Sequence, residues 1–407
     1  MSLAWMVVDF NSYFASVEQQ MEPRLRGKPV AVVPMNVDST CAIAASYEAK
    51  KFGVKTGTRV SEAKRMCPGL RIIEARHEHY VEYHHALLTA IDSCIEVRKE
   101  NVMSIDEVAC ELTGKLRERA AALEVARRIK ATIARDVGEC LRSSIGISTN
   151  IFLAKTASDM QKPDGLTVIE REELPGVLHG LELRDLCGIG WNMEGRLHAA
   201  GIRTVEELCA APKHTLHAAW GGIGGERMFE LLRGNVVPRP PERHSSIGHS
   251  HVLPPEERNE AGALAVLHRL LQKAAMRLRH MGYLAGGLAL SVKFLRRSRW
   301  GDEIVFRETS DTMEFIHALQ TLWERRPHGL APLAVGVTLF HLASRENVTP
   351  ALFPESRPRE KLDRALDALN KRYGKQTIYF AGAHNALKSA PMRIAFTRIP
   401  DLETEGD

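Results

Sequence analysis

The chain has 407 residues, of which 44% are hydrophobic and 26% are charged. At about 150 residues per domain, this length predicts two to four globular domains with ordinary cores. The 55 Lys and Arg residues exceed the 50 Asp and Glu residues by only five. So small an excess neither indicates nor excludes a nucleic-acid partner, because the clustering of charge matters more than its total.

Membrane proteins and disulfide-stabilised secreted proteins are excluded. The longest apolar stretches, 3–8 and 330–342, are shorter than the roughly 20 residues that a membrane-spanning helix needs. The first residues lack the basic, apolar and cleavage regions of a secretory signal. The seven cysteines are scattered and never form a C-x-x-C pair. Reduced thiols and a cytoplasmic location are therefore expected.

Strand and helix patterns alternate through the first 169 residues. Leu3–Val8 is an apolar strand that ends at Asp9, and the segment 13–79 has short strands and helices of its own. The pattern then predicts a helix at 80–95 and two short strands on either side of 104–107. A second helix at 116–134 and a third strand at 143–147 follow. With 13–79 set aside as an insertion, 1–12 and 80–169 give the order βαββαβ of a ferredoxin-like sheet.

The patterns change beyond residue 169. The segment 170–236 holds two glycine-bearing helical stretches, and the Pro- and Arg-rich segment 237–244 is typical of an extended linker. Residues 245–344 repeat a βαββαβ-like order, and 345–407 contain one clear helix, Arg359–Tyr373. The predicted fold class is therefore α+β with several domains.

Three carboxylates are expected to meet at one edge of the first sheet. Asp9 ends the first strand, and Asp106 and Glu107 lie between two strands that pair beside it. Neighbouring strand residues face opposite sides, so Asp106 and Glu107 can share metal ions only where a strand bends or begins. Clustered carboxylates suit two Mg²⁺ ions, or Mn²⁺ in their place, for phosphoryl transfer. The alternative is a solvated loop at Asp106-Glu107 and a helix N-cap at Asp9.

Four histidines also lie close together, at His77, His79, His84 and His85. They fall in or beside the predicted helix at 80–95 and have no cysteine or aspartate partners. An ordinary helix surface is therefore the better interpretation than a metal site.

Several sequence blocks resemble the Y-family DNA polymerases, in family order and at family spacing across residues 4–342. They are VVDFNSYFASVE (7–18), RGKPVAV (26–32), ASYEAKKFGVK (45–55), SIDE (104–107), SIGIS-N-FLAK-ASD (144–159) and KPDGL (162–166). The core is similar to the bacterial DNA polymerase IV (DinB) branch. The tail from about residue 351 is instead similar to the end of the UmuC branch.

The resemblance implies a ferredoxin-like palm at 1–12 and 80–169 with fingers at 13–79. It also implies a helical thumb with a helix-hairpin-helix at 170–236 and a DNA-binding little finger at 245–344. Such a protein would be a low-fidelity, template-directed DNA polymerase of translesion synthesis. Its partners would be primer-template DNA and dNTPs, and it would act as a monomer in the bacterial cytoplasm, at the nucleoid.

The resemblance also implies roles for individual residues. Asp9, Asp106, Glu107 and the carbonyl of Phe10 would hold two Mg²⁺ ions, with Phe14 as the steric gate against ribonucleotides. Tyr47, Lys50 and Lys162 would hold the triphosphate, although Lys50 stands where the polymerase IV branch usually has Arg. The expected DNA contacts are Gly188, Gly190, Lys293, Arg296, Arg297 and Arg299. Leu352 and Phe353 would bind a sliding clamp, in a segment that lacks the usual Gln.

Three alternative functions are weighed against this interpretation. A catalytically inactive DNA-binding paralogue would not need the three carboxylates. A nucleotidyl cyclase would use similar carboxylates on a ferredoxin-like sheet, but it would not need a helix-hairpin-helix or a basic C-terminal domain. A pure DNA-binding protein would have no use for Lys162 or for the gate.

Overall fold

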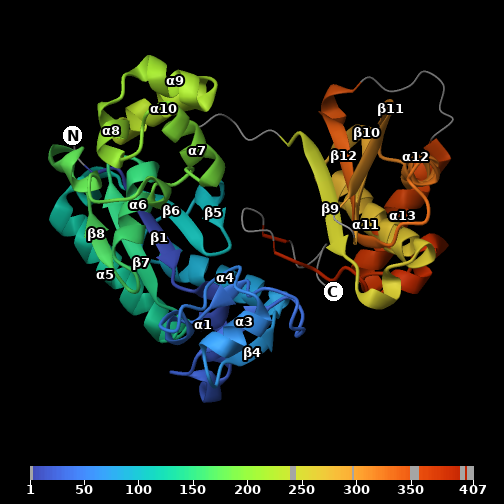
Figure 1. The fold of residues 1–407 in the computed structure, drawn as a ribbon, viewed down its shortest axis with the longest axis horizontal. Coiled ribbons are helices and arrows are strands. Elements are labelled where there is room, and N and C mark those ends of the chain that lie inside the picture. The colour runs from blue at the N-terminus through green and yellow to red at the C-terminus, as the bar shows by residue number, and fades with distance from the viewer. Residues whose placement is uncertain (1–2, 239–243, 296–297, 349–356, 395–398, 401–407) are drawn as a thin grey trace. The chain divides into compact units, whose positions relative to one another are not determined.

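The structure, a computed structural model, describes residues 3–238, 244–295, 298–348, 357–394 and 399–400. It divides into two compact units, Met1–Arg239 with Ile394–Ile399, and Pro240–Arg393 with Pro400–Asp407. Each unit has a hydrophobic core of its own. Figure 1 shows the helices and strands of each unit. Among the described residues, none of the helices combines the length and apolar character that crossing a bilayer requires.

A five-stranded sheet in the first unit carries the predicted carboxylates. Its strands, in sheet order, are β5 (Val102–Ser104), β6 (Glu107–Glu111), β1 (Trp5–Phe10), β7 (Ser143–Ser148) and β8 (Leu166–Val168). β1 pairs antiparallel with both β6 and β7, and β8 adds in parallel to β7. The first strand is thus central, as in a ferredoxin-like fold, and its end lies beside the start of β6.

Three helices support this sheet. α4 (His77–Asp92) and α5 (Arg119–Asp136) pack against each other, and α5 also packs against β7. α6 (Ile151–Met160) packs on β1 and β7. Gly146 in β7 permits this close approach, because a Cβ atom there would lie 2.0 Å from the carbonyl oxygen of Ala154. α6 is therefore held tightly against the strand that carries Asp9.

A second, smaller layer is inserted between β1 and α4. It consists of α1 (Tyr13–Met21), α2 (Tyr47–Lys50), α3 (Val60–Met66) and a three-stranded sheet in the order β3 (Ala44–Ala45), β2 (Val30–Val33) and β4 (Arg71–Glu74). Its core includes Ala45, Ala49 and Ala63. Ser12 adopts a φ of 49° and turns the chain sharply from β1 into α1, so the residues after Asp9 fold back beside it.

Four short helices complete the first unit, α7 (Trp191–Ala199), α8 (Val205–Ala210), α9 (Lys213–Trp220) and α10 (Ile223–Leu232). Leu197, Leu208 and Leu216 lie in their shared core. At Gly225 a Cβ atom would lie 1.9 Å from the carbonyl oxygen of Leu216, so glycine is what allows α9 and α10 to pack so closely.

The second unit is built on a four-stranded antiparallel sheet. Its strands, in sheet order, are β11 (Arg299–Thr309), β10 (Tyr283–Phe294), β12 (Pro332–Ser344) and β9 (Ser246–Val252), and its sheet packs against α11 (Glu260–His280) and α12 (Thr312–Glu324). The chain order is βαββαβ, as the sequence predicts. The pairing differs from that of the first unit, however, because β9 lies at an edge of its sheet whereas β1 is central.

Residues 345–348 and 357–393 belong to the second unit, whereas Ile394 and Ile399 belong to the first. α13 (Arg357–Tyr373) is followed by a short 3₁₀ helix, Ala381–Ala386, which packs on α11. The Gln272 side chain on α11 bonds both the backbone N–H and the carbonyl of Phe380. Ala386 and Ala390 join the core of this unit. These residues therefore extend the domain that precedes them.

Candidate active site

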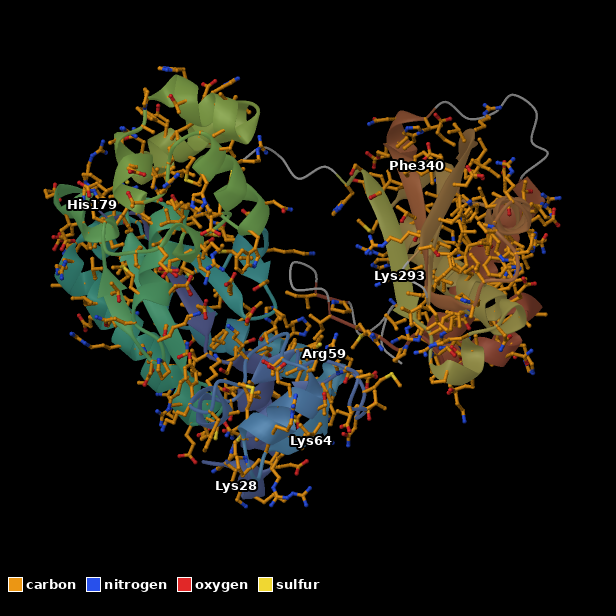
Figure 2. All side chains as sticks on the ribbon, in the orientation of Figure 1. Lys28, Arg59, Lys64, His179, Lys293 and Phe340 are labelled. Atoms are coloured by element: carbon orange, nitrogen blue, oxygen red, sulfur yellow. The ribbon has the colours of Figure 1, made fainter. Side chains whose placement is uncertain are left out.

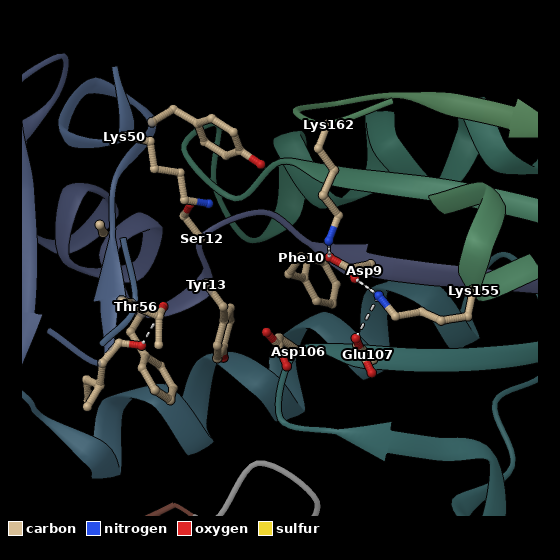
Figure 3. Close-up of a pocket in the computed structure, with 15 residues that line it drawn as sticks. Asp9, Phe10, Ser12, Tyr13, Lys50, Thr56, Asp106, Glu107, Lys155 and Lys162 are labelled. Atoms are coloured by element: carbon tan, nitrogen blue, oxygen red, sulfur yellow. Dashed lines mark hydrogen bonds and ion pairs between the residues drawn. The ribbon is translucent and has the colours of Figure 1, made fainter. Parts of the chain in front are cut away.

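Asp9, Asp106 and Glu107 come together in the first unit, where β1 ends and β6 begins (Figure 3). Asp9 is the register partner of Glu107 across β1 and β6. Asp106 lies in the turn after β5, and Glu107 is the first residue of β6. The strand thus begins at this pair, which lets adjacent carboxylates face the same space. All three line a pocket of about 230 Å³.

Two lysines lie among these carboxylates. Lys155 Nζ on α6 is 2.5 Å from Asp9 Oδ2 and 2.9 Å from Glu107 Oε1. Lys162 Nζ is 2.7 Å from Asp9 Oδ1. Asp159 binds both lysines, with Oδ2 2.9 Å from Lys155 Nζ and Oδ1 2.8 Å from Lys162 Nζ. The result is a continuous network of alternating charges.

Burial and charge shift the pKa values in this network. Burial raises the pKa of Asp106 against the opposing effect of the Ser104 hydrogen bond, and it also raises the pKa of Glu107 against the attraction of Lys155. Burial opposes the charged form of Lys155, but Asp9, Glu107 and Asp159 outweigh that effect and raise its pKa. The lysine therefore stays charged, while the two neighbouring carboxyls would be stabilised by more positive charge.

The opposite wall of the pocket comes from α1 and α2. Phe14 is buried, and its ring stacks on Tyr80 with centroids 4.5 Å apart and planes 18° apart. On α2, Lys50 Nζ lies 4.3 Å from the centre of the Tyr47 ring. Burial lowers the pKa of Lys50, and the positive Lys162 lowers it further. The four residues predicted to contact a nucleotide thus line the same pocket as the carboxylates.

The residues predicted to contact DNA do not line this pocket. Gly188, with a φ of 87°, and Gly190 precede α7 in the first unit, and Gly190 is the N-cap residue of that helix. In the second unit Lys293 on β10, which Figure 2 labels, is the register partner of Arg299 on β11. Arg296, Arg297, Leu352 and Phe353 lie outside the described residues.

Sequence reasoning missed several residues of the site. Lys155 and Asp159 lie within a block that it recognised but gave no role. Their i,i+4 spacing on a helix was an available signal, whereas their approach to Asp9 depends on how α6 packs against β1. The prediction of an ordinary surface is wrong for His84, which is 2% exposed and hydrogen-bonds the carbonyl of Ile105.

The donor set of the pocket fits a hard divalent cation. Among the described residues no three His, Cys, Asp or Glu side chains form a ready-made metal cage, and Lys155 and Lys162 instead neutralise the carboxylates. The carboxylate oxygens of Asp9, Asp106 and Glu107 are nevertheless the ligand type that Mg²⁺ prefers. The raised pKa values of Asp106 and Glu107 also favour added positive charge. The residues present therefore suit Mg²⁺ ions that compete with the two ammonium groups.

Comparison with known proteins identifies the class. Residues 8–159 match the model of the impB/mucB/samB family, residues 244–352 match that family's C-terminal domain, and residues 184–235 match the thumb domain of DNA polymerase-iota. The chain belongs to the Y family of DNA polymerases. The fold and this membership make it a translesion DNA polymerase, and neither the cyclase nor the inactive paralogue is favoured.

Two bacterial relatives match most of this chain. DNA polymerase IV of Moorella thermoacetica is 35% identical over 92% of this chain and 95% of the relative. DNA polymerase IV 1 of Bacillus subtilis is 32% identical over 91% of both chains. Among solved structures, a Y-family DNA polymerase chimera of Dbh and Dpo4 has a TM-score of 0.70 at 24% identity, over 84% of this chain and 99% of that one. DinB from Sulfolobus solfataricus has a TM-score of 0.55 at 24% identity, over 83% and 98%. These structures support the fold.

Proposed function

We propose that this chain adds dNTPs to a primer 3′ end opposite damaged template, with Asp9, Asp106 and Glu107 as its metal-binding carboxylates. The observation that carries the proposal is a single pocket in which three carboxylates face three lysines and an aromatic wall. Burial raises the pKa values of Asp106 and Glu107, and both side chains face this pocket, as expected of groups that take part in chemistry.

The charges of the pocket match this substrate. Its lining contains three carboxylates and three lysines. A dNTP triphosphate carries about four negative charges, and two Mg²⁺ ions carry an equal positive charge. The nucleotide and its ions therefore enter with no net change in charge, which limits the electrostatic cost of filling a half-buried site.

Each part of the lining has a role in this proposal. Asp9, Asp106, Glu107 and the carbonyl of Phe10 would hold the ions. Those ions, when bound, would lower the pKa of the primer 3′ hydroxyl and neutralise the triphosphate. The hydroxyl would lose its proton to water, and its oxygen would form a bond to the α-phosphorus while the bond from that phosphorus to the bridging oxygen breaks and pyrophosphate leaves. The lysines Lys50 and Lys162, with the hydroxyl of Tyr47, would hold the phosphate oxygens.

Phe14 would exclude ribonucleotides. Its ring is held by the stacking on Tyr80 and lines the pocket, so the ring cannot withdraw from a sugar placed against it. A 2′-hydroxyl would then clash. Phe14→Ala should admit ribonucleotides, whereas Phe14→Tyr, which keeps the ring, should retain sugar discrimination. Unchanged discrimination in Phe14→Ala would remove this role.

Primer extension with Mg²⁺ and dNTPs tests the catalytic proposal. The wild-type chain should extend a primed template, and Asp106→Ala should not. Asp136→Ala is the control, because Asp136 is an exposed acidic residue at the end of α5 that pairs with its neighbour Arg135. Absence of extension by the wild-type chain would overturn the proposal. Full activity of Asp106→Ala would overturn the assignment of the carboxylates.

The second unit would hold duplex DNA by its phosphates. Support comes from the adjacent cations Lys293 and Arg299, and the glycines Gly188 and Gly190 of the first unit would add backbone N–H contacts. Replacing Lys293 and Arg299 by Ala should reduce the slope of log affinity against log salt by about two. Arg325→Ala should leave the slope unchanged, because Arg325 pairs with Asp302. An unchanged slope in the double variant would refute these contacts.

Further parts of the proposal concern partners and location. The chain would act as a monomer at the nucleoid, and its bacterial relatives support a location in the cytoplasm. A sliding clamp is proposed to bind Leu352 and Phe353. Deleting these two residues should abolish clamp-stimulated synthesis while leaving basal synthesis intact, and undiminished stimulation would exclude the site.

A further inference from the structure

The turn that carries Asp106 is pinned at several polar atoms. The backbone N–H of Phe10 donates to the carbonyl of Asp106 at 2.8 Å. Ser104 Oγ donates to Asp106 Oδ1 at 2.7 Å and accepts the Asp106 backbone N–H at 3.4 Å. On the other side of the turn, the carbonyl of Ile105 meets Nδ1 of His84 at 2.8 Å.

His84 comes from a different element, the buried face of α4. Its neighbours at helical spacing, Tyr80, Leu87 and Ile91, are fully buried, and His84 itself is 2% exposed. A carbonyl can only accept a hydrogen bond, so Nδ1 carries the proton. Burial lowers the pKa of His84 to about 4, which keeps the ring a neutral donor at neutral pH.

The His84 and Ser104 contacts act on the same peptide unit. The Ile105 carbonyl and the Asp106 N–H belong to one rigid plane. His84 holds the oxygen of that plane and Ser104 holds its nitrogen. Fixing both polar atoms fixes the rotation of the plane, and with it the direction in which the Asp106 Cα–Cβ bond leaves the backbone.

We infer that His84 is a positioning residue that aims the Asp106 carboxylate through its hydrogen bond to the Ile105 carbonyl. The inference rests on the proposed role of Asp106 as a metal ligand. Removing a residue that holds a metal ligand in place typically lowers metal affinity or activity by about 10- to 100-fold. Without His84, the buried carbonyl loses its donor and the peptide plane is held at only one end.

The chain offers matched variants for the test. His84→Leu removes the donor, and His84→Asn keeps an N–H donor near the position of Nδ1. His85→Leu is the control, because His85 is the next residue on α4 and is exposed. The readouts are kcat, KM for dNTP, the Mg²⁺ midpoint of primer extension and, without any nucleotide, Mn²⁺ binding followed by electron paramagnetic resonance.

We expect His84→Leu to lower kcat by about 10- to 100-fold. It should weaken Mn²⁺ binding, and raise the Mg²⁺ concentration at the midpoint of primer extension, by a similar factor. The KM for dNTP at saturating Mg²⁺ should stay within about threefold, because the triphosphate contacts are untouched. His84→Asn should recover kcat and Mn²⁺ binding to within about threefold of the wild type. A merely structural role would lower thermal stability and leave Mn²⁺ binding of the folded protein unchanged, and that result would overturn the inference.

A second pair of variants covers the case in which His84→Leu does not fold. The amide nitrogen of Asn lies near the Nδ1 position, and that of the longer Gln lies near Nε2. His84→Gln should therefore show the kcat and Mn²⁺ defects that His84→Asn does not, and equal behaviour of the two would refute the inference. Asp106→Ala distinguishes a failure of the catalytic assignment of Asp106 from a failure of the role of His84. If it retains activity, the catalytic assignment fails. If it is inactive while every His84 variant is normal, only the role of His84 fails.

Discussion

Each unit of the molecule contains a buried ion network, and the two networks have different geometry. In the first unit Lys155 Nζ pairs with Asp9, Glu107 and Asp159, and the first two of these carboxylates line an open pocket. In the second unit Arg279 binds Asp367 with two nitrogens, at 2.6 and 2.8 Å, and donates to Thr312 Oγ1 at 2.8 Å. Lysine is a single point charge, whereas arginine forms a planar fork with fixed directions.

A raised pKa does not by itself distinguish these networks. Burial raises the pKa of Asp363 beside Arg279, just as it raises the pKa of Asp106 in the pocket. Asp363 Oδ2 also accepts the backbone N–H of Thr312, so this carboxylate links α13 to the start of α12. The comparison teaches that a perturbed carboxyl indicates chemistry where it also faces a pocket that a ligand can enter.

Asp9→Asn against Asp367→Asn gives the sharpest test of this distinction. Asp9→Asn removes a charged ligand from the proposed metal site, and we expect kcat for nucleotide addition to fall by about a thousandfold, equivalent to about 4 kcal/mol. Asp367→Asn should leave kcat within about threefold, since it touches only the packing of α13. Single-turnover incorporation measures both, and similar losses in the two variants would erase the functional difference between the networks.

Much of the fold could be predicted from the sequence, because periodicity records which residues are buried. The predicted strand at 143–147 matches β7 within one residue, and the predicted helix Arg359–Tyr373 matches α13 within two. Periodicity does not indicate the order of strands in a sheet. Both units read as βαββαβ, yet β1 is central and β9 lies at an edge.

The candidate site divides in the same way. Asp9, Asp106 and Glu107 stand out because charged residues directly follow or precede buried strands. Lys155 could not be placed from its neighbours in sequence, since its partner Asp9 lies 146 residues away and the contact depends on the packing of α6 over Gly146. The contact of Arg279 with Asp367 depends in the same way on how α13 packs. Contacts of this kind follow from tertiary packing, which local patterns do not specify.

Removing the cation of the second network should cost stability. Arg279→Met leaves the buried Asp363 and the half-buried Asp367 without their cation. We expect the second unit to lose about 3–5 kcal/mol of unfolding free energy. Hydrogen exchange in increasing urea, followed on peptides of β12, measures this unit separately. Arg325→Met, which breaks only the exposed pair with Asp302, should cost less than about 1 kcal/mol. A loss that Mg²⁺ relieves would contradict a purely structural role for Arg279.

The corresponding change in the first network should respond to metal. Lys155→Met leaves Glu107 without its cation and Asp9 with Lys162 alone. Without Mg²⁺ we expect the first unit to lose about 2 kcal/mol, less than the second because water reaches the pocket. Saturating Mg²⁺ should reduce that loss, since an ion that binds the folded state replaces the missing charge. The measurement is hydrogen exchange in urea on peptides of β1, with and without Mg²⁺. An equal loss under both conditions would mean that these carboxylates do not hold Mg²⁺.

The smallest expected effect concerns one buried histidine in each unit. Burial lowers the pKa of His84 in the first unit and of His251 in the second to about 4, from an ordinary value of 6.5. Below pH 6.5 the unfolded chain binds a proton that the folded chain does not accept until about pH 4. The contribution of each neutral histidine to the free energy of unfolding is therefore fully present above pH 6.5. It falls as the pH drops, by about 1 kcal/mol per histidine between pH 7 and 5.5.

Variants separate the two histidines. His84→Asn should remove about 1 kcal/mol of this acid sensitivity from the first unit alone, and His251→Asn should do the same for the second unit alone. Carboxyls that titrate in the same range are common to each variant and the wild type, so they cancel in the difference. Hydrogen exchange in urea at pH 7 and 5.5, on peptides of α4 and β12, resolves the two units. If His84→Asn left the pH response of α4 unchanged, burial would not be what keeps the His84 ring neutral. That result would contradict the description of His84 as a buried, neutral donor to the Ile105 carbonyl.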